Sequence, residues 1–455
     1  MHMPHPLSSL HQPFVLKQLC YICLSLSLLP FFVCRQEVVE PMALFLWLVL
    51  AFSLLVWRFA SVLRSVPAPR RRCGDSPLRV CVVLGSGGHT SEMMRIVETL
   101  KTEIWGHHRP FYVVSSTDSH SASLAKQFEE RNFGRCCRLH IIPRAREVGQ
   151  SYFLSIFTTL RALWSCVFLA LDEKPDVILV NGPGVCVPVV AGALLVAILI
   201  PSSCYCRPAI AFIETYSSVS HMSVSGKLLG PISDVCVVQW LKLYENYQHK
   251  WWWGCKNIFF VGTRNTAEEN GLQQRLSPML GKFDGSEEGG GAGSMALVTV
   301  GSTQFTPLIE AVDNEEVLRA LAKRGITQLL VQKGTSPYVN RISFAHGVSV
   351  EVFPYRPKLH EIIQKAALVI SHAGAGTILE VLESKKPMIA VPNRALMLDH
   401  QLEFAEALSN ERYIYCVQVA DLCKQLQRLD LGALRVYPGA DTAELLRLLT
   451  PLFSL

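Results

Sequence analysis

The sequence lacks a large excess of charge of either sign. Across 455 residues, 43 lysines and arginines stand against 37 aspartates and glutamates, a net charge of only +6. The basic residues form no stripe with interleaved aromatic residues, so nothing indicates that the chain binds nucleic acid. Half of the residues are apolar and only 18% are charged. The mean hydropathy of +0.27 is high for a purely soluble protein.

Metal-ligand spacing is also lacking, although the sequence has 15 cysteines. Cys136 and Cys137 are adjacent, while Cys204 and Cys206 have no paired histidine or cysteine nearby. Zinc sites repeat such ligands at short, regular intervals. We therefore predict no metal site, no cofactor and no disulfide framework. The cysteines are interpreted as reduced, mostly buried thiols, which is consistent with the cytosol.

Two long apolar runs account for much of the hydropathy. Residues 42–60 are long enough to cross a bilayer, and Arg64 and the arginine triplet 70–72 follow them. Because basic flanks stay on the cytosolic side, everything after this run is expected in the cytosol. The earlier run, 18–34, fits either a second span or translated upstream sequence with Met42 as the natural start. A cleaved signal peptide is disfavoured because a second apolar run follows at once.

After a linker at residues 61–77, short apolar strands alternate with helical stretches. Predicted strands cover 78–84, 111–115, 176–180 and 209–213, and a predicted helix covers 90–101. This alternation favours a parallel sheet with helices on both faces. The apolar residues 185–200 are short for a span, so we expect a buried or interfacial helix. The apolar helix around 152–171 indicates that this half rests on the membrane surface.

A glycine-rich stretch separates the two halves. Residues 281–294 cannot pack a core, so 265–294 is predicted to be a flexible linker. The alternation then resumes, which predicts a second α/β domain. Its predicted strands are 295–300, 328–332, 367–371 and 387–391, and its predicted helices are 358–365, 377–384 and 400–409. The amphipathic stretch 442–452 is expected to dock on the body of the protein.

The first predicted strand leads into a glycine-rich turn, Gly85-Ser86-Gly87-Gly88-His89-Thr90. Glycines let the backbone approach a ligand closely, and the helix that follows offers free N–H groups to an anion. The turn is not a P-loop, because no Gly-Lys-Ser/Thr follows, and Thr90 stands where a dinucleotide fingerprint has its third glycine. His89 fits a general base, a phosphate partner or a helix cap.

The second half holds a sharper signal. The turn Ser371-His372-Ala373-Gly374-Ala375-Gly376-Thr377 follows a strand and presents amides to an anion, and Gly301-Ser302-Thr303 provides another cradle at the same edge. Glu380 lies one helical turn on, where a carboxylate accepts hydrogen bonds from ribose hydroxyls. The alternative for Glu380 is a first-turn acid that the helix dipole favours. Asp399-His400-Gln401 forms a polar cluster after the next strand.

Several of these motifs, in order and spacing, resemble the eukaryotic Alg14 and Alg13 proteins joined in that order. The Alg14-like motifs are Gly85–Thr90, Ile142–Val148, Asn181–Gly184, Met222–Lys227 and Val238–Trp240. The Alg13-like motifs are Val300–Thr303, Ser371–Glu380 and His400–Gln401. The resemblance covers residues 42–425.

The resemblance implies a glycosyltransferase of the GT-B type, related to bacterial MurG. Its fold class would be α/β, with two Rossmann-like domains behind an N-terminal transmembrane anchor. The implied enzyme is inverting and transfers N-acetylglucosamine (GlcNAc) from UDP-GlcNAc to GlcNAc-diphospho-dolichol, the second step of lipid-linked oligosaccharide synthesis for N-glycosylation. The implied location is the endoplasmic reticulum membrane, with the catalytic domains on the cytosolic face. Other glycosyltransferases of the same pathway are further implied partners.

The resemblance also suggests how the chain is divided. We expect an N-terminal extension at 1–41, a transmembrane anchor at 42–65, an Alg14-like acceptor-side domain at 78–264, the linker at 265–294 and an Alg13-like UDP-sugar-binding domain at 295–455. In most such organisms the two domains are separate chains that must associate. A short flexible linker would make their association intramolecular, with an effective concentration in the mM range.

Residue roles follow from the resemblance in the same way. The donor would be held by Gly301, Ser302, Thr303, His372, Gly374, Ala375, Gly376, Thr377, Glu380, Asp399 and Gln401. The acceptor or its phosphates would be held by Gly85, Ser86, Gly87, Gly88, Thr90, Arg144, Arg146, Asn181 and Gly182. His89 and Glu214 are the candidate catalytic residues, and the sequence does not choose between them. For Glu214 the alternative is a structural polar role, and for Arg144 and Arg146 it is solvated surface charge.

The chain contains no Asp-x-Asp pair. This fits stabilisation of the departing UDP by backbone amides and a helix dipole rather than by a bound metal. Two other functions stay open. One is a nucleotide-dependent oxidoreductase, which the missing third glycine of the first turn disfavours. Against a non-catalytic membrane scaffold, which would recruit a separate glycosyltransferase subunit, stands the presence of a donor-type and an acceptor-type half in one chain.

Overall fold

The computed structural model describes residues 40–65, 77–100, 104–144, 152–249, 257–263, 294–301, 303–356, 359–393 and 400–453. The chain divides into two compact units, Met1–Arg64 and Ser65–Leu455. The apolar run at 18–34 and the glycine-rich stretch at 281–293 lie outside the described residues.

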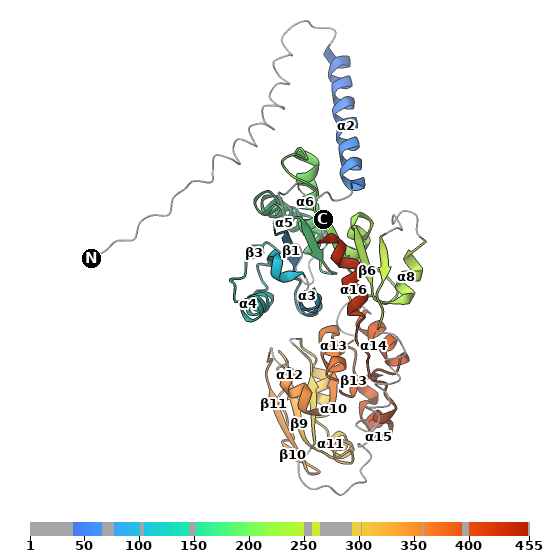
Figure 1. Ribbon diagram of the computed structural model, residues 1–455. Helices are drawn as coiled ribbons and strands as arrows, with labels where there is room; N and C mark the ends of the chain where they lie inside the picture. The colour runs from blue at the N-terminus through green and yellow to red at the C-terminus, as the bar shows by residue number, and fades with distance from the viewer. Residues whose placement is uncertain are drawn as a thin grey trace, which may run out of the picture. The chain divides into compact units, whose positions relative to one another are not determined.

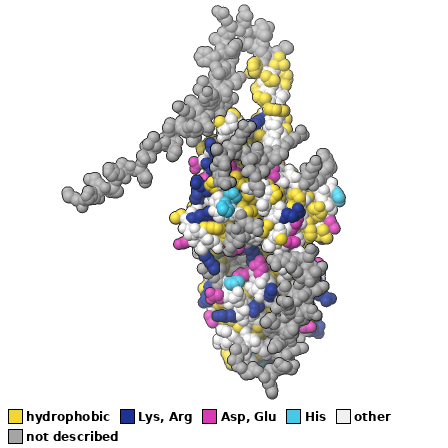
Figure 2. All heavy atoms as spheres, in the orientation of Figure 1, with side chains coloured by type: hydrophobic (Ala, Val, Ile, Leu, Met, Phe, Trp, Pro, Cys, Tyr) yellow, Lys and Arg dark blue, Asp and Glu magenta, His cyan; other side chains and the backbone are white. Residues whose placement is uncertain are grey.

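The first unit contains helix α2 (Glu40–Arg64). Its segment Leu44–Leu63 has a mean hydropathy of 2.0 over 20 residues and is only 6% buried. Figure 2 shows apolar side chains, in yellow, along this helix. A helix of that length measures about 30 Å, which matches the hydrocarbon core of a bilayer. Helix α2 is therefore long and apolar enough to be the expected anchor.

The first sheet of the second unit has seven strands in the order β3-β2-β1-β4-β5-β6-β7, all paired in parallel. The strands are β1 (Arg79–Val83), β2 (Arg109–Ser115), β3 (Leu139–Ile142), β4 (Val177–Val180), β5 (Ala209–Ile213), β6 (Val235–Val238) and β7 (Ile258–Phe260). Strands β4, β5 and β6 are buried throughout, which explains their unbroken apolar runs. The chain reverses its direction of travel across the sheet between β1 and β4, and ligands bind at such switch points.

Helices connect these strands (Figure 1). They are α3 (Gly88–Leu100), α4 (Ser119–Phe133), α5 (Tyr152–Glu173), α6 (Cys186–Leu199), α7 (Val224–Leu229) and α8 (Leu241–Tyr247), with 3₁₀ turns η2 (Trp105–His107) and η3 (Gly230–Ile232). Helix α6 is largely buried, which confirms the expected core helix. A Cβ on Gly192 in α6 would lie 2.9 Å from the Cys166 backbone in α5. The two helix backbones therefore approach closely at that glycine.

The second sheet also has seven strands, in the order β10-β11-β9-β8-β12-β13-β14. They are β8 (Ser294–Thr299), β9 (Ile326–Gln332), β10 (Phe344–Ala345), β11 (Val348–Phe353), β12 (Ala366–Ser371), β13 (Met388–Ala390) and β14 (Tyr415–Cys416). Strand β10 pairs antiparallel with β11, and the other pairs are parallel. The expected second α/β domain is confirmed, while the β10–β11 hairpin was not predicted.

The helices of the second half follow the same pattern. They are α10 (Thr306–Val312), α11 (Glu315–Ala322), α12 (His360–Lys365), α13 (Ala375–Glu383), α14 (His400–Asn410), α15 (Leu422–Arg428) and α16 (Thr442–Leu449), with 3₁₀ turns η6 (Val419–Asp421), η7 (Leu431–Ala433) and η8 (Thr450–Leu452). Two hydrophobic clusters form the core on the faces of this sheet.

The C-terminal helix α16 packs on the first sheet rather than the second. Its buried face, Leu445, Leu448 and Leu449, belongs to the same core cluster as residues of β1, β2 and α3. Figure 1 shows this red helix beside the green strands of the first sheet. The expected docking of 442–452 is confirmed, and its partner is the first half of the chain. We call the first sheet with its helices and α16 the first domain, and the second sheet with its helices the second domain.

Apolar side chains also join the two domains. Val219 of the first domain belongs to a core cluster made otherwise of second-domain residues. Trp240 meets Phe404 edge to face, with ring centroids 6.1 Å apart. The Trp240 indole nitrogen donates to the Tyr216 carbonyl at 2.7 Å, which fixes the ring's orientation.

Candidate active site

The first glycine turn lies between β1 and α3, at the carboxyl edge of the first sheet. Gly87 has a φ of +63°, a conformation that glycine adopts without strain. A Cβ on Gly85 would collide with the Pro183 ring. The turn is therefore pressed against the Asn181–Gly184 loop that follows β4, and glycine is needed for that contact.

Neighbouring side chains hold this turn in place. The Asn181 amide donates to the His89 carbonyl at 2.9 Å, and the Ser121 hydroxyl donates to the Gly85 carbonyl at 3.0 Å. Thr90 shares a buried hydrogen bond of 2.6 Å with Ser121. Thr90 and Asn181, expected to bind the acceptor, thus have supporting contacts inside the protein.

His89 sits at the start of α3 with a third of its side chain exposed. Its Nδ1 lies 3.8 Å from Oε2 of Glu92, one helical turn on, and has no hydrogen-bond partner among the described residues. Burial lowers the pKa of His89, but the Glu92 carboxylate and then Glu214 outweigh burial and raise it above its ordinary value. Glu92 is buried and accepts a hydrogen bond from the Thr215 hydroxyl at 2.9 Å.

Glu214 follows β5 and is only 1% exposed. One carboxylate oxygen accepts from the Thr215 amide at 2.9 Å, and the other accepts from the Ser223 amide at 3.0 Å and the Ser223 hydroxyl at 3.1 Å. A Cβ on Gly226 would collide with this carboxylate. Burial raises the pKa of Glu214, and its hydrogen bonds oppose that rise. These contacts favour the structural role for Glu214 and leave His89 as the exposed candidate base.

In the second domain, His372 supports two glycine turns. The ring is 5% exposed, and Cβ atoms on Gly301 and Gly374 would lie 3.0 Å and 2.5 Å from it. The His372 amide donates to the Thr299 carbonyl at 3.2 Å, which links the turns after β8 and β12. Burial lowers the pKa of His372 to about 4, so the ring is neutral at pH 7. His372 therefore packs against both glycine turns as a neutral, buried side chain.

Ala373 has a φ of +64° and is completely buried. The left-handed region is unfavourable for a residue with a Cβ and costs about 1–3 kcal/mol. Ala373 directly precedes Gly374, the N-cap of α13, which begins at Ala375. The sequence placed Ala373 in the predicted turn, but its left-handed backbone was not predicted, because alanine carries no signal for that conformation.

The two glycine-rich helix starts meet. Gly88 begins α3, and a Cβ on Gly376 in the first turn of α13 would lie 3.4 Å from the Gly88 Cα. The N-termini of both helices therefore lie together, where unpaired N–H groups and two helix dipoles favour an anion. About two helical turns further along both helices, Arg95 of α3 and Glu383 of α13 form an ion pair of 3.2 Å.

Glu380 is on α13, two-thirds buried, with its Oε1 3.8 Å from His360 Nδ1. Burial raises the pKa of Glu380, while Arg95 and His360 lower it. Its place, one turn beyond the glycine contact, is compatible with the expected ribose contact. In α14, Oε1 of Gln401 is buried and has no hydrogen-bond partner within the described segments.

Not every expected residue joins this site. Arg144 follows β3 and lines a separate pocket with Thr117 and Arg161. Arg146, Ser302 and Asp399 lie outside the described residues. Where the structure describes the chain, no group of three or more His, Cys, Asp or Glu residues is placed to hold a metal.

Among solved structures, the chain resembles MurG from Acinetobacter baumannii. The TM-score is 0.53 with 16% sequence identity, over 82% of this chain and 100% of that structure. At that identity the likeness shows the fold alone. It confirms the expected GT-B architecture of two Rossmann-like domains.

Sequence comparison separates the two halves. The first resembles the mouse protein called UDP-N-acetylglucosamine transferase subunit ALG14, with 38% identity over 191 residues, 40% of this chain and 85% of the relative. The human ALG14 subunit is 38% identical over 200 residues, 42% of this chain and 88% of that protein. The second half resembles the human subunit ALG13, with 42% identity over 121 residues, 26% of this chain. The chain spans only 11% of the length of that ALG13 protein.

Two family descriptions match in the same order. "Oligosaccharide biosynthesis protein Alg14 like" matches residues 80–256, and "Glycosyltransferase family 28 C-terminal domain" matches residues 295–447. The match to ALG14 covers most of that protein's length, so the chain belongs to the Alg14 family and continues, in the same polypeptide, into a glycosyltransferase family 28 C-terminal domain.

Proposed function

We propose that this chain is an inverting glycosyltransferase that moves GlcNAc from UDP-GlcNAc to GlcNAc-diphospho-dolichol. The product would be di-GlcNAc-diphospho-dolichol. The observation that carries the proposal is the contact of Gly88 with Gly376, because it joins the anion-binding helix starts of the two halves. Relatives of both halves are named as UDP-GlcNAc transferase subunits, which supports the choice of donor.

The donor is proposed to bind the second domain. Its diphosphate would face the amides of Gly374 to Thr377, where the dipole of α13 favours negative charge. Glu380 would accept hydrogen bonds from the ribose. Gln401 brings a buried oxygen that has no hydrogen-bond partner among the residues the structure describes, and it fits a hydroxyl donor on the sugar. Gly301, Ser302, Thr303 and Asp399 complete the proposed donor set.

Inversion needs a single displacement, with one base and one stabilised leaving group. The acceptor hydroxyl would attack the anomeric carbon while His89 removes its proton. The departing UDP would gain negative charge beside the α13 amides, which are already oriented and need no reorganisation. Glu92 would steady the proton that His89 takes up, because its carboxylate lies beside Nδ1.

The membrane placement is part of the same proposal. Helix α2 would anchor the chain in the endoplasmic reticulum, and the basic residues after it would keep the catalytic domains on the cytosolic face. Helix α5 is a second candidate span by composition, with 22% of the window buried. Its contacts with α6 and its exposed apolar face support a surface position instead.

Sugar transfer by the single purified chain tests the proposal. The chain is incubated with UDP-GlcNAc, a GlcNAc-diphospho-isoprenoid and EDTA, and the lipid product is analysed by mass spectrometry. A di-GlcNAc lipid is expected, and it would establish donor, acceptor and independence from a divalent metal together. If folded protein gives no product with EDTA or with added Mg²⁺ but gains activity with a separate catalytic subunit, the chain is a scaffold and the proposal fails.

A further inference from the structure

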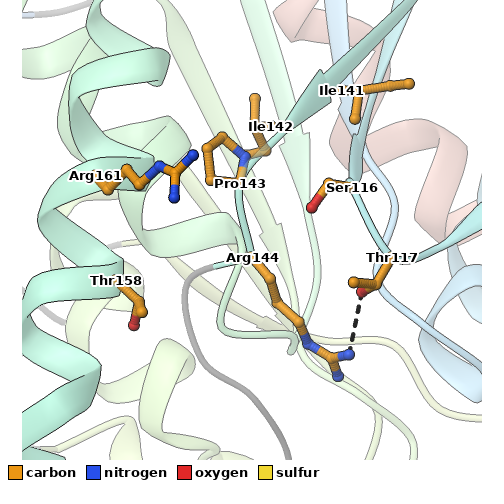
Figure 3. A pocket seen from close by; sticks show the side chains of 8 residues that line it. All are labelled: Ser116, Thr117, Ile141, Ile142, Pro143, Arg144, Thr158 and Arg161. Carbon is orange, nitrogen blue, oxygen red and sulfur yellow. Dashed lines mark hydrogen bonds between the residues drawn. The ribbon is translucent and has the colours of Figure 1, made fainter.

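A pocket of about 350 Å³ lies apart from the helix starts that meet at Gly88 (Figure 3). Three elements form it: the ends of β2 and β3 and one side of α5. Its polar lining residues are Ser116, Thr117, Arg144, Thr158 and Arg161. The described lining thus offers two guanidinium groups and three hydroxyls, and none of the described lining residues carries a carboxylate, so this lining is positively charged.

The two arginines come from different elements. Arg144 lies just after the end of β3, and its guanidinium group donates to the Thr117 hydroxyl at 3.2 Å. Figure 3 shows Arg161 extending from α5 toward Pro143, which directly precedes Arg144. Guanidinium groups match the geometry of phosphate oxygens, and hydroxyls complete such sites as donors. This lining therefore fits a phosphate or diphosphate.

The exposed face of α5 next to this pocket is apolar. Ile156, Leu160, Trp164 and Phe168 recur every fourth residue, and they are 54%, 56%, 67% and 44% exposed. Arg161 follows Leu160 in the sequence and is exposed on the same helix. A helix that exposes large apolar residues beside cationic ones lies well at a lipid surface, with its charges at the headgroup level. The ligand that fits both features is a phosphate carried by a lipid.

The pocket opens at the same sheet edge as the proposed reaction site. Strand β2 pairs with β1, which leads into the first glycine turn. Just after Thr117, Asp118 caps α4 by accepting from Ser121, and Ser121 donates to Gly85. One short hydrogen-bonded path thus joins the pocket wall to the glycine turn.

We propose that this pocket binds the diphosphate of an isoprenoid-linked acceptor, with Arg161 and Arg144 as its cationic contacts. The identity of the acceptor rests on the function proposed above. The pocket would hold the diphosphate near the membrane surface while the attached sugar extends toward His89. A phospholipid headgroup offers the same chemistry, so the experiment compares the two sources.

Binding is measured first, because it does not depend on sugar transfer. Farnesyl diphosphate is titrated calorimetrically into the full chain in detergent, with farnesol as the uncharged comparison. Arg161→Gln is expected to weaken farnesyl diphosphate about tenfold, about 1.4 kcal/mol, and to leave farnesol unchanged. Arg131→Gln, an exposed arginine of α4, is the matched control and should change neither. Equal affinity of Arg161→Gln and wild type for farnesyl diphosphate would overturn the site.

The source of the phosphate is then tested in nanodiscs of phosphatidylcholine with and without phosphatidylglycerol. If the acceptor is the ligand, farnesyl diphosphate binds equally in both. Competition by phosphatidylglycerol in wild type, absent in Arg161→Gln, would assign the pocket to a headgroup and overturn the proposal. In the transfer assay, Arg161→Gln should raise the KM for the lipid acceptor and leave the KM for UDP-GlcNAc unchanged. A chain that binds farnesyl diphosphate but transfers no sugar would refute the proposed function alone.

Discussion

Three polar residues lie in succession next to His89. Glu92 lies beside its Nδ1, Thr215 donates to Glu92, and the Thr215 amide donates to the buried Glu214. The arrangement provides a negative group for the protonated ring. The nearby carboxylate of Glu92 raises the pKa of such a base.

Replacing Glu92 should therefore change the pH dependence of catalysis. The neutral form of His89 would be the base, so activity rises as pH passes upward through its pKa. Because Glu92 raises that pKa, Glu92→Gln should move the acidic limb of kcat/KM to lower pH and reduce the plateau of kcat about tenfold or more. His89→Ala should remove the limb and lower kcat without unfolding the protein. Glu130→Gln, at an exposed position of α4, is the control and should give the wild-type pH profile. A Glu92→Gln profile identical to that of the wild type would argue against this role.

His372 predicts an acid sensitivity of the second domain. Burial lowers its folded pKa to about 4 from 6.5, so only the unfolded chain binds this proton between those values. The contribution of neutral His372 to the free energy of unfolding is complete above pH 6.5. It is lost as the pH falls toward 4, and the loss is about 2–3 kcal/mol at pH 4.5. Because His372→Gln cannot titrate, its stability deficit relative to wild type should shrink on acidification. Denaturant titrations in detergent at pH 7.5 and 4.5 measure this, and a constant deficit would contradict it.

Glu380 predicts a selective loss of donor affinity. Its carboxylate is proposed to accept hydrogen bonds from the ribose, so Glu380→Ala should raise the KM for UDP-GlcNAc about tenfold or more. The acceptor KM should stay the same, and the thermal midpoint should change little. Glu406→Ala, an exposed glutamate on α14, is the control. An unchanged donor KM would remove Glu380 from the site.

At the scale of elements, the close packing of α5 against α6 requires a residue without a Cβ at position 192. A Cβ on Gly192 would press against the Cys166 backbone, which cannot move independently of α5. Gly192→Ala should cost about 1–3 kcal/mol of stability through overpacking. Gly106→Ala places its Cβ in open space and should leave the thermal midpoint nearly unchanged. Equal midpoints for both variants would show that the helices separate at little cost.

Most strands that the sequence predicts are those with strong apolar runs. Strands β1, β4, β5, β8 and β12 are buried and apolar, and each lies within a residue or two of its predicted bounds. The β10–β11 hairpin was missed because its turn, His346-Gly347, has φ values of +53° and +82°. Such turns are recognised by Asn-Gly or Asp-Gly, and histidine does not carry that signal.

The sequence predicted those parts of the candidate site that lie in or next to glycine-rich turns and polar motifs. Gly85, Gly88 and Gly376 were predicted from the glycine-rich turns, and of these Gly85 lies where a Cβ would collide with Pro183. Glu92 resembles an ordinary helical acid until the fold places it beside His89 and Thr215. Arg161 gave no signal at all, since its pocket exists only where α5 meets the ends of two strands that are distant in sequence. Contacts between distant segments depend on tertiary packing, which no local pattern contains.

At the scale of the whole molecule, the first domain depends on the last helix of the chain. Leu449 is fully buried in the core cluster of the first sheet. Leu449→Ala should destabilise that domain by about 2–5 kcal/mol. Hydrogen exchange should then accelerate in β1 and β2, which lie more than 300 residues earlier. Arg447→Ala, on the exposed side of α16, should leave exchange in those strands as in wild type. Faster exchange confined to the second domain would contradict this dependence.

The packing of α16 on the first domain also affects how much the two domains depend on the peptide chain that connects them. Just before α16, Thr263 pairs with Ala440, and the Asp441 amide donates to the Gly262 carbonyl at 3.0 Å. Cutting the peptide chain anywhere between Thr263 and Ser294 would leave that pairing and the leucine face of α16 in place. The two fragments would stay together as a non-covalent pair. On this structure, the same catalyst can be encoded by one gene or by two, and a gene fusion or fission needs no new interface to succeed.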